Sequence, residues 1–93
     1  MEKVKVVGSV LCPDTLLALC KLKDADVALD FHNITGTMQE LKEYLRLRDT
    51  EPMFEQAKAE GRVGIPFFVL PDGTKTWQWQ EVLTWAQNHA EKA

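Results

Sequence analysis

The sequence is poor in cysteine, and its two cysteines, Cys12 and Cys20, are badly spaced for an internal disulfide. On a single helix, their separation corresponds to about 12 Å. A disulfide requires Cα atoms within about 7 Å of each other. This spacing excludes a disulfide framework and leaves both thiols free within one folded chain.

The sequence also lacks an excess of basic residues and any long hydrophobic run. Its 11 lysines and arginines are outnumbered by 14 aspartates and glutamates, which gives a net charge of −3. Because phosphate backbones are bound by clustered basic side chains, we expect no nucleic-acid partner. The apolar stretches VVGSVL and IPFFVL are far shorter than the ~20 residues that span a bilayer. The N-terminus does not resemble a signal peptide, so we expect a cytoplasmic protein with no membrane partner.

The remaining composition is typical of one soluble globular domain, with 45% hydrophobic and 27% charged residues. A chain of 93 residues fits a single domain, and no repeat or linker divides it. We therefore treat residues 1–93 as one domain and expect it to act as a monomer.

Strand and helix patterns alternate in the N-terminal half. The valine-rich segment 3–10 predicts a strand buried on both faces. Helical spacing follows from Pro13, with the apolar residues 16–20 expected on the inner side. Cys20 belongs to this run, so we expect it to be a buried packing residue. Segment 27–34 alternates apolar and polar residues and predicts a second strand.

Helical patterns continue after this strand. Thr35 or Thr37 is expected to cap a helix, and Asp49 or Thr50 to cap a shorter one that ends at Ala59.

The C-terminal third predicts a β-hairpin around a Pro-Asp-Gly turn and a final helix over residues 78–90. The complete order is β-α-β-α-α-β-β-α, which predicts an α/β fold with a four-stranded mixed sheet flanked by helices. Such sheets bind ligands where the carboxyl ends of strands meet helix N-termini.

Cys12 lies at the first strand-to-helix junction, directly before Pro13. Main-chain N–H groups at a helix N-terminus lack intrahelical partners and, with the helix dipole, favour an anion. The thiolate is the nucleophilic form of cysteine, so this position predicts an accessible, reactive Cys12. Asp14 acts in the opposite direction, because a nearby carboxylate disfavours a second negative charge. The alternative is an inert packing cysteine.

Pro66 stands directly before an apolar strand, although proline is disfavoured inside a central strand. A cis Ile65–Pro66 bond would resolve this conflict by making a turn at the start of the strand. Such a turn would leave the main-chain groups of Ile65 available to an extended substrate, as in β-strand addition.

The segment CPDT at a strand-to-helix turn, followed later by GIPFFVLPDG, resembles the glutaredoxins of the thioredoxin fold. The resemblance covers nearly the whole chain in length and element order. It implies that Cys12 is the nucleophile of thiol–disulfide exchange, that Pro66 is the cis-proline, and that glutathione is the partner thiol.

Three positions depart from the glutaredoxin pattern. Thr15 replaces the second cysteine, so an external thiol would have to release a mixed disulfide on Cys12. Ser9 stands where a lysine is usual for a glutathione carboxylate. The expected Gly-Gly and paired Asp are missing before the last helix, where bulky Trp77 occupies the region and Glu81 is the remaining acidic residue.

Our leading hypothesis is a monothiol glutaredoxin-like oxidoreductase that removes glutathione from disulfide substrates. Cys12 and Thr15 are the predicted catalytic residues, with the Thr15 hydroxyl hydrogen-bonded to the sulfur. The predicted substrate-binding residues are Pro13, Ile65, Pro66, Trp77 and Glu81. Glutathione is the expected co-substrate, and no metal is expected because the histidines accompany no ligand-spaced cysteine. The alternative is a non-enzymatic thioredoxin-fold module for redox sensing, iron–sulfur cluster binding or protein binding.

Overall fold

The structure is a computed structural model that describes residues 3–90, and its elements occur in the predicted order. The elements are β1 (Val4–Gly8), α1 (Pro13–Asp24), β2 (Leu29–Asn33), α2 (Met38–Thr50), the 3-10 turn η1 (Pro52–Phe54), α3 (Glu55–Ala59), β3 (Phe67–Val69), β4 (Lys75–Thr76) and α4 (Trp79–Ala90). Within residues 3–90, no helix is both long and apolar enough to cross a membrane.

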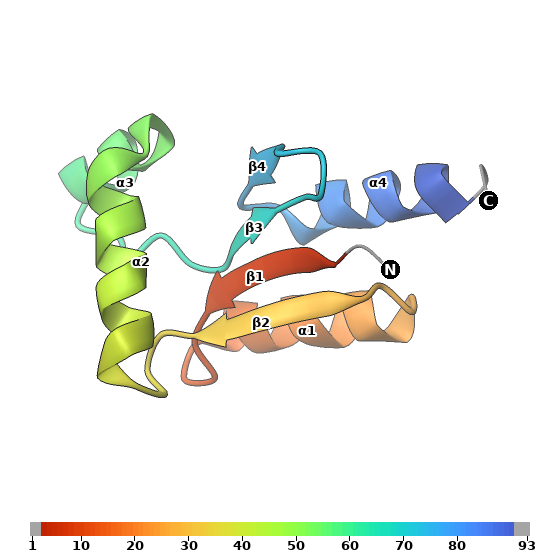
Figure 1. Ribbon diagram of the computed structural model, residues 1–93, viewed down its shortest axis with the longest axis horizontal. Helices are drawn as coiled ribbons and strands as arrows, with labels where there is room; N and C mark the ends of the chain where they lie inside the picture. Colours follow the sequence, from red (N-terminus) through yellow and green to blue (C-terminus); the bar gives the residue numbers. More distant parts are fainter. Residues whose placement is uncertain (1–2, 91–93) are drawn as a thin grey trace.

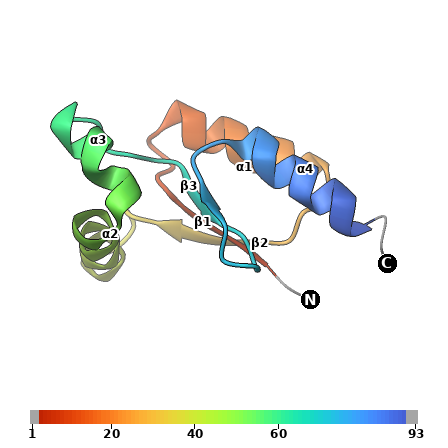
Figure 2. The same cartoon turned by 90° about the horizontal axis from the view of Figure 1, so that it is seen from above.

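The four strands form one mixed sheet in the order β2-β1-β3-β4. β1 and β2 are parallel, whereas β3 is antiparallel to both β1 and β4. The predicted α/β fold is therefore confirmed, and its topology is thioredoxin-like. Figure 2 shows α1 and α4 on one face of the sheet and α2 on the other. In Figure 1, the end of β1 that leads into α1 lies on the same side of the molecule as α2 and α3.

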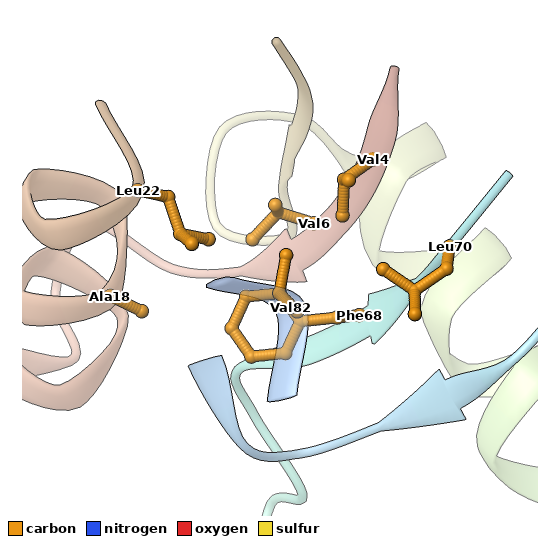
Figure 3. Close-up of a cluster of buried hydrophobic side chains, with 7 residues drawn as sticks. All are labelled: Val4, Val6, Ala18, Leu22, Phe68, Leu70 and Val82. Carbon is orange, nitrogen blue, oxygen red and sulfur yellow. The ribbon is translucent and has the colours of Figure 1, made fainter. Parts of the chain in front are cut away.

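Each face of the sheet has its own core. Because side chains alternate along a strand, β1 contributes to both faces. The core beneath α1 and α4 gathers small and branched side chains around Phe68 (Figure 3): Val4, Val6, Ala18, Leu22, Phe68, Leu70 and Val82. The core beneath α2 is more aromatic: Val7, Ile34, Tyr44, Phe54, Ala57 and Phe67. This second core supports the segment that precedes β3.

The inner face of α1 differs from the prediction. Its buried side chains are Thr15, Ala18 and Leu22, which follow the spacing of one helical face. Cys20 is exposed, so the prediction that it is a buried packing residue is wrong. Residues 16–20 are apolar on every side of the helix. The docking of α1 on the sheet therefore decides which of them are buried.

The boundary after α2 also differs. Asp49 and Thr50 were predicted to cap the shorter helix, but both lie in the last turn of α2. The Thr50 hydroxyl donates to the Arg46 carbonyl in the same helix at 2.8 Å. The break falls at Glu51, because the residue before a proline is disfavoured in the helical conformation, and Pro52 then begins η1.

His32 on β2 contacts two carboxylates, of which Glu40 lies on α2 and Asp30 on β2 itself. Its Nδ1 lies 3.0 Å from Glu40 Oε2, and its Nε2 lies 3.1 Å from Asp30 Oδ2. Nearby, Thr37 caps α2 by accepting from the Glu40 N–H, which confirms one of the two predicted caps. Partial burial alone would lower the pKa of His32. The hydrogen bonds and charges of the two carboxylates outweigh burial and raise this pKa above its usual value.

The folded protein is expected to lose stability as His32 deprotonates. Because folding raises the pKa of His32, its contribution is fully present below the unfolded-state value of 6.5. The contribution is lost as the pH rises through the higher folded-state pKa. Urea unfolding of wild type and His32→Gln from about pH 6 to about pH 8 tests this difference. Identical pH profiles would contradict it.

Candidate functional site

Cys12 occupies the position immediately before the first turn of α1. Its N–H donates to the Ser9 carbonyl at 3.0 Å, and its own carbonyl accepts from the Leu16 N–H at 3.1 Å. The side chain is partly exposed and makes no capping hydrogen bond. Pro13 begins the helix, as predicted. The main chain around Cys12 is thus held in place while the thiol stays available.

Thr15 and Ser9 support this junction from inside the molecule. Thr15 is completely buried, and a Cβ placed on Gly8 would lie 2.7 Å from its side chain. Its hydroxyl accepts from the Ser9 N–H at 3.4 Å. No hydrogen bond joins Thr15 to the Cys12 sulfur within residues 3–90, so the structure places Thr15 as a support for the loop.

Ser9, which stands at the position of the expected lysine, is 3% exposed. Its hydroxyl lies 2.7 Å from that of Thr35 and accepts from the Leu11 N–H at 3.0 Å. The first contact joins the loop before Cys12 to the segment that follows β2, and the second holds the loop itself. A short hydroxyl therefore fixes this loop, and Ser9 presents no charge to a substrate.

Cys12 opens onto a groove with a volume of about 560 Å³. Its lining includes Cys12, Asp14 and Leu17 from the start of α1. The rest of the lining comes from segments 62–66 and 77–80. The fold thus brings the predicted residues Ile65, Pro66 and Trp77 together with Cys12, although they are distant in the sequence.

Three successive carbonyls in segment 62–64 each accept a hydrogen bond from a side chain elsewhere in the fold. Arg48 Nη2 donates to the Arg62 carbonyl at 2.7 Å, and the Tyr44 hydroxyl donates to the Val63 carbonyl. Trp77 Nε1 donates to the Gly64 carbonyl at 3.0 Å. Burial raises the pKa of Tyr44 to about 12, although Arg48 acts in the opposite direction, so the hydroxyl keeps its proton. We call these three side chains the carbonyl clamp.

The segment 62–64, which the carbonyl clamp holds, leads directly into the Ile65–Pro66 bond. This bond is cis, as predicted. Gly64 precedes it with φ +88°, and a Cβ there would lie 2.8 Å from Phe54 Cε1. Neither main-chain group of Ile65 makes a hydrogen bond to any residue in the described range 3–90. Ile65 can therefore pair with an extended ligand in the groove.

A protein of Haemophilus influenzae, described as an uncharacterized protein, is 39% identical to this chain over 73 residues. The aligned region covers 78% of this chain and 85% of the relative. The chain belongs to the same family as this protein. No family model matches the sequence, and no solved structure matches it. The relative's description names no activity.

Glu81 is not in the groove. It accepts a hydrogen bond from the Thr76 hydroxyl and faces a separate hollow between β4 and α4. The Thr76 hydroxyl also accepts from the Gln78 N–H at 3.0 Å. Thr76 therefore connects Glu81 to the end of β4. The structure therefore separates Glu81 from the other predicted substrate-binding residues.

The sequence did not indicate that Tyr44 and Val63 are parts of the site, nor that Arg48 binds the main chain of segment 62–64. Tyr44 and Arg48 lie on α2, and no local pattern indicates that they reach the segment before Pro66. Gly64 did carry a signal, because a glycine directly before Ile-Pro is compatible with a positive φ.

One group of potential metal ligands occurs within the described residues: His32, Glu40 and Glu43, whose ligand atoms lie within 4.8 Å of one another. Both ring nitrogens of His32 are already hydrogen-bonded to carboxylates. The group lies between β2 and α2, on the face of the sheet away from α1 and α4 (Figure 2). We assign it to the attachment of α2, separate from the Cys12 groove.

Replacing Trp77 by phenylalanine is expected to weaken the carbonyl clamp. The indole of Trp77 also packs edge-on against Phe54, with ring centroids 5.3 Å apart, and a phenyl ring can keep part of this contact. The Gly64 carbonyl would lose its donor, which should lower the free energy of unfolding by about 1–2 kcal/mol in urea denaturation. An unchanged stability would show that this bond is unimportant for the fold.

Proposed function

We propose that the chain is a monothiol glutaredoxin-like thiol–disulfide oxidoreductase that uses glutathione to reduce glutathionylated substrates. The observation that supports this proposal is the arrangement around the groove. An available thiol at a helix N-terminus and the unpaired main chain of Ile65 line the same groove, which has a volume of about 560 Å³. Thiolate stabilisation favours attack on a disulfide sulfur, and main-chain pairing can hold an extended substrate beside the thiol.

The proposed reaction has two exchange steps, each of which forms one S–S bond and breaks another. In the first step, the Cys12 thiolate attacks the glutathione sulfur of a glutathionylated polypeptide. The polypeptide sulfur leaves as a thiolate and takes a proton from water. In the second step, a glutathione thiolate attacks the glutathione sulfur bound to Cys12, which forms oxidised glutathione and restores the Cys12 thiolate. No second protein cysteine is required, in keeping with Thr15.

Each part of the site has a separate role in this proposal. The free N–H groups of α1 stabilise the Cys12 thiolate and the departing charge. Ile65 and Pro66 form the wall against which the substrate lies, and Trp77 holds this wall through Gly64. Asp14 also lines the groove, and its carboxylate favours a cationic substrate group beside it, such as the ammonium group of glutathione.

The proposal is compatible with a cytoplasmic monomer, as predicted from the sequence, because glutathione keeps cytoplasmic thiols reduced. The alternative is a thioredoxin-fold module without enzymatic activity, in which Cys12 senses oxidants, holds an iron–sulfur cluster or contacts a partner.

The test is turnover of a glutathionylated peptide by the wild-type chain, with glutathione, glutathione reductase and NADPH consumption as the readout. Turnover above the uncatalysed exchange is expected. Absence of turnover, together with alkylation of Cys12 at the rate of an ordinary thiol, would contradict the proposal and favour a binding module. An iron–sulfur absorption band in freshly prepared protein would favour the cluster alternative.

A further inference from the structure

Exposed apolar side chains are concentrated around Cys12. In the described part of the chain, the large hydrophobic residues that are exposed are Val10, Leu11, Leu16, Leu17, Met38, Leu45 and Val63. Four of these lie within five positions of Cys12 in the sequence, and Val63 lines the groove. Exposed apolar patches of this kind mark interaction sites.

Three of these residues are closely associated with Cys12. Leu11, directly before Cys12 in the sequence, is 77% exposed, and Leu17 and Val63, which line the same groove as Cys12, are 48% and 57% exposed. We call these three residues the apolar collar. Because their main chains belong to the Cys12 loop, α1 and the clamped segment 62–64, the collar is held on three separate supports.

The charges in the groove disfavour an acidic polypeptide segment. Its ionisable residues other than Cys12 are Asp14 and Arg62. Arg62 Nε lies 2.8 Å from Glu60 Oε1, so its charge is already compensated. Ser9 is buried and neutral. An acidic segment would therefore meet the carboxylate of Asp14 without an uncompensated cation to balance it.

We propose that the polypeptide half of the substrate is an extended segment with bulky apolar side chains on both sides of its disulfide-bonded cysteine. The segment pairs with the free main chain of Ile65, and its flanking side chains pack on the apolar collar. This inference rests on the proposed function and specifies its substrate. In the first exchange step, the collar holds the polypeptide whose sulfur leaves as a thiolate.

The test compares three glutathionylated peptides of equal length whose cysteine is flanked by leucine, serine or aspartate. We expect kcat/KM for the leucine peptide to exceed that for the serine peptide by about tenfold, mainly through KM, because apolar area is buried. The aspartate peptide should be the poorest substrate. Equal kcat/KM values for the leucine and serine peptides would overturn the inference while the proposed function stands.

Substitutions in the collar test whether it causes the preference for the leucine peptide. Leu11→Ser and Val63→Ser should bring the leucine-to-serine ratio close to one. Met38→Ser is the matched control, because Met38 is 67% exposed but begins α2 and does not line the groove. A ratio that falls equally in all three variants, or in none, would overturn the role of the collar.

Two further measurements separate this inference from its basis. If the wild type turns over no peptide, the proposed function fails. Tryptophan fluorescence then measures the binding of the three reduced peptides to Cys12→Ser. Tighter binding of the leucine peptide would then support the collar, and equal binding would overturn it. A second copy of this chain is the alternative occupant of the collar, and sedimentation tests for it. If the wild type is a dimer and Leu11→Ser is a monomer, the collar is assigned to a second copy and the inference is overturned.

Discussion

Cys12→Ser is expected to reduce turnover of a glutathionylated peptide by at least about a hundredfold, because a serine hydroxyl stays protonated and is a poor nucleophile toward sulfur. The substitution changes one atom at a partly exposed position, so the fold should be retained. Circular dichroism and urea unfolding check this retention. The activity readout is NADPH consumption coupled through glutathione reductase.

Cys20→Ser is the matched control for this experiment. Cys20 is the other thiol of the chain, but it is exposed on α1 and does not line the groove. Its replacement should leave turnover at the wild-type level. Wild-type activity in Cys12→Ser would remove Cys12 from the role of nucleophile. Loss in both would point to a requirement for two thiols, contrary to the monothiol route.

Gly64→Ala is expected to lower the free energy of unfolding by about 2–4 kcal/mol, because two effects add. The main chain has φ +88°, where an L side chain is strained. The added Cβ would lie 2.8 Å from Phe54 Cε1 and 3.0 Å from the Tyr44 hydroxyl. Phe54 is fully buried, so it has little room to move. Urea denaturation measures the loss.

Gly73→Ala separates the two effects. Gly73 has a similar φ of +93°, but nothing lies within 4 Å of a Cβ placed there. We expect a loss of only about 1 kcal/mol from the backbone conformation. Equal losses in the two variants would show that the contact with Phe54 is unimportant. A larger loss for Gly64→Ala should also be accompanied by reduced peptide turnover, because the displaced main chain forms a wall of the groove.

The sequence predicted the order of helices and strands well because those signals are local. The alternation of segment 27–34, the threonine cap at Thr37 and the proline at the start of α1 each act within a few residues. The cis Ile65–Pro66 bond was also predicted correctly. Errors arose where neighbouring residues carried equivalent patterns, as in the apolar run 16–20, where Cys20 is exposed.

The site also divides into features set by adjacent residues and features set by the tertiary structure. The sequence alone determined that Cys12 precedes a helix and that Pro66 precedes a strand, because both features depend on adjacent residues. Only the tertiary structure decided that Thr15 faces the end of β1 and that Glu81 lies outside the groove. It also brought the carbonyl clamp to the three carbonyls before Ile65. The physical reason is that side-chain direction and long-range contacts depend on how helices dock on the sheet, and local patterns carry no information about that docking.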